Sequence, residues 1–97
     1  MSKLRKFARG QECTVQLHPY CNMNLETTVL AHAPSEDKGI GKKSPDYWGA
    51  HCCSDCHDII DYRRRVDISN EEIYRAHIRG VYRTLKRAME AGLIEQS

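Results

Sequence analysis

The sequence predicts a small α+β domain over residues 1–97, in which a strand–strand–helix unit precedes one long helix. Two observations lead to this prediction. β-branched and apolar residues gather in two short segments on either side of a loop rich in proline and glycine. The C-terminal third instead repeats its apolar residues at helical spacing. We place the strand–strand–helix core at about 27–65 and the C-terminal helix at about 70–91.

The elements follow in order along the chain. Residues 1–10 read as a basic arm or a helical turn, and residues 27–32, "TTVLAH", as a first strand. Residues 33–46 hold two prolines, two glycines and six charges, which predicts a loop. A loop this long in a small domain is more often functional than idle. Residues 47–52 can form a second strand, and a helix begins near Ser54.

The C-terminal helix has the clearest signals. Ser69 followed by Glu72 fits a capping box, and Gly92 is a stop signal. His77 lies on the apolar stripe of this helix, so we interpret it as a packed core histidine. The opposite face is mostly arginine and lysine.

The composition implies a core that needs further support. Hydrophobic residues make up 40% of the chain and aromatic residues 7%, and a chain this short buries roughly 60–65% of its unfolded surface. No apolar run follows the basic residues Lys3, Arg5 and Lys6, so we expect neither a signal peptide nor a membrane span. We therefore expect a cytoplasmic protein, whose five cysteines would bind metal rather than form disulfides.

Four of the cysteines predict one structural zinc site. Cys53 and Cys56 have the two-residue spacing of a zinc knuckle, and Cys13 and Cys21 flank a short segment that contains a turn. Four thiolates suit tetrahedral Zn²⁺, whose binding energy would become folding energy. Cys52 points away from Cys53 on an extended strand, so we interpret it as a small buried apolar residue. His18 and His51 are rival ligands.

The sequence "CSDCH" at residues 53–57 also fits two other sites. C-x-x-C-H is the attachment signature of a c-type haem, and C-x-x-C occurs in thioredoxin-like redox pairs. Haem attachment normally needs export, which the N-terminus does not suggest, and no βαβ pattern surrounds the cysteines. The zinc site is therefore the preferred interpretation, and we expect no haem.

Basic residues cluster although the formal net charge is only +2. The clusters are Lys3–Arg9, Lys38–Lys43, Arg63–Arg65 and the exposed face of the C-terminal helix. Each cluster alone could be a solvated surface. Together with a metal site they favour a polyanionic partner such as DNA.

His57, which the four-cysteine zinc site does not need as a ligand, suggests a more specific function. His57 would be held beside the knuckle, while His32 ends the first strand and Asp46 precedes the second. This order resembles the ββα-metal core of HNH endonucleases. The segments "LRKFARGQECTVQ", "ETTVLAH", "GKKSPD" and "CCSDCHDIID" resemble the YbcO family of small nucleases encoded by phages and prophages. The stretch from "GKK" to "CHDIID" is also similar to Ref, a recombinase-dependent HNH nuclease of phage recombination.

This resemblance implies phosphodiester hydrolysis that depends on Mg²⁺ or Mn²⁺. It assigns His32 as the general base and His57 as a ligand of the catalytic metal. Asp46 stands near the middle residue of the motif as a second ligand, and Lys43 would steady the phosphate. The expected DNA contacts are Lys42, Lys43, Arg63, Arg64 and Arg65.

The chain departs from the HNH pattern at two positions. Ala31 stands where many HNH enzymes carry a metal ligand, and Asp46 lies early in place of the middle asparagine. His32 and Asp46 could then be an ordinary strand-end histidine and turn aspartate. The alternative function is a non-catalytic zinc-binding adaptor for nucleic acid or protein. As a nuclease, the chain would work in phage recombination or DNA processing in the bacterial cytoplasm, with a recombinase as a candidate partner.

Overall fold

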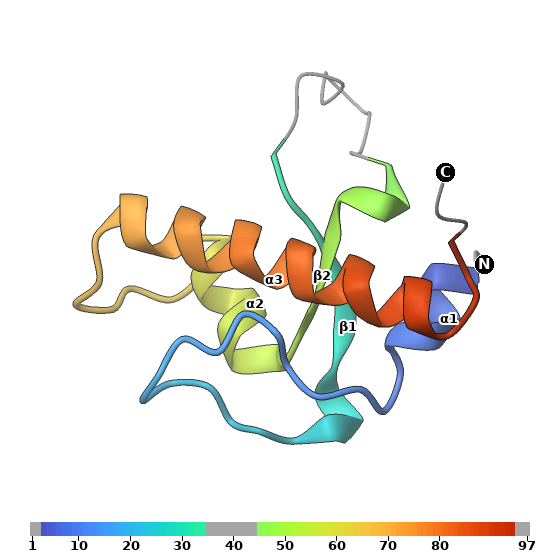
Figure 1. Ribbon diagram of the computed structural model, residues 1–97. Coiled ribbons are helices and arrows are strands. Elements are labelled where there is room, and N and C mark those ends of the chain that lie inside the picture. Colours follow the sequence, from blue (N-terminus) through green and yellow to red (C-terminus); the bar gives the residue numbers. More distant parts are fainter. Residues whose placement is uncertain (1–2, 35–44, 95–97) are drawn as a thin grey trace.

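The computed structural model describes residues 3–34 and 45–94. Its two-stranded sheet and long C-terminal helix give the α+β class that the sequence predicts (Figure 1). The elements in order are α1 (Lys3–Ala8), a 3₁₀ turn (Leu25–Thr27), β1 (Val29–His32), a second 3₁₀ turn (Asp46–Trp48), β2 (Gly49–Cys52), α2 (Ser54–Ile60) and α3 (Asn70–Glu90). Among the described helices, none is both long and apolar enough to cross a bilayer.

The two strands pair in antiparallel fashion. Their register places Val29 opposite Cys52 and His32 opposite Gly49. Both strands begin two residues later than predicted, because a 3₁₀ turn takes up the expected first residues of each. The side chain of Asn24 accepts a hydrogen bond from the backbone of Glu26 and so caps the first turn. This local bond competes with extended pairing.

The helix boundaries follow the local signals closely. The thiol of Cys53 accepts a hydrogen bond from the backbone N–H of Cys56 at the start of α2. The hydroxyl of Ser69 accepts one from the backbone N–H of Glu72, which confirms the predicted cap of α3. Gly92 follows α3 with a φ of 76°, as its stop signal indicated.

The core lies where α3 packs against β2, and in Figure 1 α3 crosses in front of the hairpin. Gly80 permits this close approach. A Cβ atom there would lie 3.0 Å from Ala50 Cβ, Thr14 Oγ1 and Val15 Cγ2. His77 is buried in the same face of α3, as predicted.

The segment that carries Cys13 is fastened to α3 by arginines spaced four residues apart. Arg79, Arg83 and Arg87 donate hydrogen bonds to carbonyls of residues 12–15, at distances of 2.8 to 3.3 Å. Below them, the Thr14 hydroxyl donates to the carbonyl of His51 at 2.9 Å. Part of the basic face of α3 therefore binds the protein's own backbone.

Candidate functional site

Cys13, Cys21, Cys53 and Cys56 converge at one buried point. Their sulfur atoms all lie within 4.8 Å of one another. Cys13 and Cys21 come from the segment before β1, whereas Cys53 caps α2 and Cys56 lies in its first turn. The strand–helix junction and the N-terminal segment therefore meet at this group.

The surroundings of the cysteines suit a metal such as zinc. Backbone N–H groups of Gln16 and Leu17 point at the sulfurs of Cys13 and Cys56, at 3.5 and 3.4 Å. Such bonds stabilise thiolates and orient metal ligands. Four sulfur donors in a closed, buried group match a structural zinc site, in which the metal would cross-link the two segments.

The rival ligands have other surroundings. His18 is exposed. His51 is buried, its Nδ1 accepts a hydrogen bond from Arg87 at 3.2 Å, and burial together with the Arg87 charge lowers its pKa to about 4. Cys52 is buried as predicted, but hydrogen bonds to the thiols of Cys13 and Cys56, together with burial, raise its pKa well above the usual range. Cys52 thus lies beside the four-cysteine group as a neutral neighbour.

A second group of polar side chains lies at the other end of β1. His32 Nε2 is 2.7 Å from Asp46 Oδ1, and Arg5 Nε approaches the same oxygen at 3.2 Å. The structure therefore brings Asp46 to the imidazole of His32. An ionised carboxylate can only accept a hydrogen bond, so Nε2 carries the proton in this pair. The lone pair of the neutral ring is then on Nδ1.

His57 has a carboxylate partner of its own. Its Nε2 lies 3.1 Å from Asp61 Oδ2, one helical turn further along. Sequence reasoning missed Asp61, although the spacing of four residues from His57 could have indicated it. Arg63 also pairs with Asp61, at 3.3 Å. One imidazole nitrogen and one carboxylate oxygen therefore lie side by side at the end of α2.

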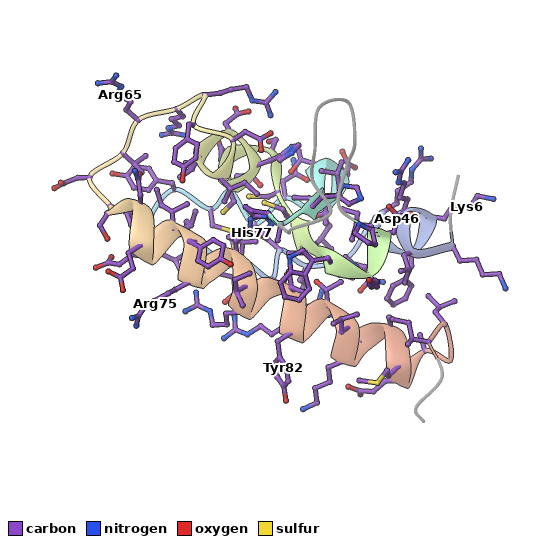
Figure 2. All side chains as sticks on the ribbon, turned by 90° about the horizontal axis from the view of Figure 1, so that it is seen from above. Lys6, Asp46, Arg65, Arg75, His77 and Tyr82 are labelled. Carbon is purple, nitrogen blue, oxygen red and sulfur yellow. The ribbon has the colours of Figure 1, made fainter. Side chains whose placement is uncertain are left out.

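A cavity of about 220 Å³ is lined by one residue of each pair. It is lined by His32 from β1, Asp61 from the end of α2 and His77 from α3, among others. His77 donates from Nε2 to the carbonyl of Ala31 at 2.9 Å and so holds the end of β1. Figure 2 shows His77 between α3 and the rest of the molecule.

The residues expected to contact DNA differ in their ion pairs. Lys42 and Lys43 lie outside the described residues. Arg63 pairs with Asp58 and Asp61. Arg64 pairs with Asp55 at 3.0 Å and lies over the ring of Tyr20. Within the described chain Arg65 makes no ion pair, and it projects outward in Figure 2.

The described residues form a small α+β domain with a buried four-cysteine group that could hold a metal. Comparisons with known proteins show the family to which the chain belongs. Residues 2–93 match the family described as "Putative nuclease YbcO". The chain therefore belongs to the YbcO family. Proteins of that name from Escherichia coli (strain K12) and Enterobacteria phage 82 are each 50% identical over 64 residues, which cover 65% of this chain and 67% of each relative.

A solved structure has a similar fold. It is described as that of "a putative bacteriophage protein from Escherichia coli str. K-12 substr. MG1655", and it has 36% identity and a TM-score of 0.79. The match covers 93% of this chain and 100% of the other. The phage association expected from the resemblance is therefore confirmed.

Proposed function

We propose that the chain is one HNH-type nuclease domain, which hydrolyses phosphodiester bonds in DNA with Mg²⁺ or Mn²⁺. A nuclease-like function is supported by the family to which the chain belongs. The observation that carries the finer assignment is the His32–Asp46 pair at the end of β1, whose His32 lines the same cavity as Asp61. The four-cysteine group would hold a structural zinc beneath this site.

His32 is the proposed general base. Asp46 holds its Nε2–H, so the lone pair of Nδ1 can accept the proton of the attacking water. The sequence suggested Asp46 as a metal ligand. Its 2.7 Å contact with His32 instead supports a positioning role, in which the carboxylate fixes the tautomer and the orientation of the ring.

His57 and Asp61 are the proposed ligands of the catalytic metal. The two atoms that now lie 3.1 Å apart could both bind one divalent cation. Asp61 would then supply the carboxylate that the alanine at position 31 cannot. When bound, the cation polarises the scissile phosphate and stabilises the leaving oxygen.

Basic residues would hold the DNA backbone around this site. Lys43 is proposed to steady the phosphate, with Lys42 and Arg65 as further contacts. Arg63 and Arg64 already bind carboxylates, so their contribution to DNA binding requires exchange of those ion pairs. A role in phage recombination, with a recombinase as partner, follows from the similarity to Ref.

A cleavage assay on plasmid DNA tests the assignment. We expect nicking that requires added Mg²⁺ or Mn²⁺, while the zinc content of the protein stays constant. His32→Ala should reduce the rate by roughly 10²-fold or more at unchanged metal demand. His57→Ala and Asp61→Asn should both raise the metal concentration needed for half-maximal rate.

Two results would contradict the proposal. Full activity of His32→Ala would place the base elsewhere. Absence of metal-dependent cleavage by the folded, zinc-loaded protein would favour the alternative, a zinc-binding adaptor.

A further inference from the structure

The C-terminus of α2 carries a non-glycine residue in the left-handed region, a conformation that Gln16 and Met23 also adopt before β1. The backbone N–H of Arg63 bonds to the carbonyl of Asp58 at 2.8 Å, and that of Tyr62 to Ile59 at 3.1 Å. These two bonds form a Schellman motif, in which the residue after the cap is left-handed and is usually glycine. Here that residue is Tyr62, with a φ of 59°.

The end of α3 provides the comparison within the same chain. Leu93 bonds to Ala88 at 2.9 Å and Gly92 to Met89 at 3.0 Å, in the same pattern. Gly92 takes the left-handed position with a φ of 76°. Glycine adopts this conformation without steric conflict, whereas a bulky aromatic residue is strained there. Strain of this kind clusters at functional sites.

Core packing does not account for the tyrosine. Tyr62 is 64% exposed, so its ring covers little of the core. It lines the 220 Å³ cavity together with Tyr74, which is 47% exposed. Ile60 and Ile73, both buried, line the same cavity. Two accessible tyrosines and two buried isoleucines thus line one cavity, and an aromatic ring of this kind can stack on another flat ring.

The cavity wall also includes two residues of the proposed hydrolytic site. His32 and Asp61 line the same cavity as the two tyrosines. Its volume is several times the roughly 30 Å³ that one water occupies in the liquid. A group bound between the tyrosines would therefore lie next to the phosphate that His32 is proposed to act on.

We propose that this cavity, with Tyr62 as its main stacking residue, binds the base of an unpaired nucleotide beside the scissile phosphate. The proposal rests on the proposed nuclease function and names its substrate class as single-stranded DNA. Bases within a duplex are already stacked on both faces, so only an unpaired base can offer a face to Tyr62. Stacking of this type accepts any base, because every base has a π-face.

Binding to matched DNA probes tests the inference in the absence of cleavage. The probes are a fluorescein-labelled single strand, its duplex, and the single strand with one central abasic site. Ca²⁺ replaces Mg²⁺, and fluorescence anisotropy gives the dissociation constant. We expect the intact single strand to bind tighter than the duplex, and the abasic site to weaken binding.

The variant Tyr62→Gly removes the stacking ring without an expected loss of fold stability. Glycine suits the left-handed position, so the melting temperature should stay the same or rise. Affinity for the single strand should nevertheless fall by roughly 5- to 140-fold, the range expected for one stacked base. Tyr62→Phe keeps the ring and should bind as the wild type does. Tyr82→Ala, which removes an exposed tyrosine that points away from α3 in Figure 2, is the matched control and should also bind normally.

The possible outcomes distinguish a failure of the stacking proposal from a failure of the proposed nuclease function. If Tyr62→Gly folds and binds the single strand as tightly as the wild type, the stacking proposal is overturned even if the enzyme cleaves DNA. If duplex binds as tightly as single strand, the substrate class is wrong. If no DNA is cleaved but single strands bind through Tyr62, the nuclease assignment fails and the binding site stands.

Discussion

The two histidines of the proposed site, His32 and His57, each pair with a carboxylate, and the two carboxylates come from different parts of the chain. Asp46 reaches His32 across a loop, whereas Asp61 reaches His57 within one helix. The first pair fixes a ring that must accept a proton, and the second places two potential metal ligands together. The same chemical groups thus suit different roles because of where the backbone places them.

Buried His77 gives a prediction about pH. Burial lowers the pKa of His77 in the folded protein, and the charges of His57 and His32 act in the same direction. The carboxylate of Asp61 and the hydrogen bond to the Ala31 carbonyl oppose this shift. In the unfolded chain a histidine has a pKa of about 6.5. The unfolded state therefore binds more protons, and the stability that neutral His77 contributes is present above pH ~6.5 and lost as the pH falls.

His77→Gln should remove this part of the acid sensitivity. The glutamine amide can still donate to Ala31, but it does not titrate. Urea unfolding at pH 7 and at pH 5 measures the free energy of unfolding of both proteins. As the pH falls, the wild type should lose more of this free energy than His77→Gln does, by at most about 1.4 kcal/mol per pH unit. Parallel curves would mean that His77 does not titrate differently in the two states.

At the scale of elements, the contact of α3 with β2 depends on a missing side chain. Gly80 lies in the middle of a helix, where glycine costs about 1 kcal/mol relative to alanine. Its neighbours at 3.0 Å belong to β2 and to the segment that carries Cys13. Thr14 is held by hydrogen bonds to His51 and Thr84, so it cannot easily move.

We therefore predict that Gly80→Ala destabilises the protein despite its better helix propensity. Overpacking of a tight core typically costs about 1–3 kcal/mol, which exceeds the gain in propensity. The midpoint of thermal or urea unfolding measures the net effect. Tyr82→Ala on the exposed face of α3 is the control and should change stability little. A more stable Gly80→Ala variant would show that the neighbours can move apart.

For the whole molecule, the four-cysteine group is the point at which separate segments are joined. The N-terminal segment, the β2–α2 junction and α2 itself all contribute sulfurs to it. α3 then holds the N-terminal segment from the other side through its arginines. A metal at this point would support the small core of a chain of 97 residues.

We predict about one zinc per chain and loss of the folded state when it is removed. Cys56→Ser should release the metal and lower the melting temperature strongly, because metal binding in such a domain is coupled to folding. Cys52→Ala should keep its zinc, since its thiol is not one of the four converging sulfurs. Metal analysis and circular dichroism give both readouts. A zinc-loaded Cys56→Ser variant with an unchanged melt would contradict the ligand assignment.

Local signals in the sequence were sufficient for the ends of α3 and for the Cys53–Cys56 pair. The cap at Ser69, the stop at Gly92 and the two-residue spacing of Cys53 and Cys56 each act over a few residues. Such interactions do not depend on the rest of the fold, so they can be interpreted from the sequence by itself. The two strands could be predicted from their β-branched and apolar residues, and their pairing was expected because they are neighbours along the chain.

Only the tertiary structure decided which side chains of the candidate site meet. The 3₁₀ turn at Asp46 and the register of the hairpin bring Asp46 to His32, and the approach of α3 through Gly80 brings His77 to the end of β1. The ring of Tyr62 reaches the same cavity because α2 ends in a left-handed residue. These contacts join residues from different elements, and they depend on packing distances that no short sequence pattern encodes.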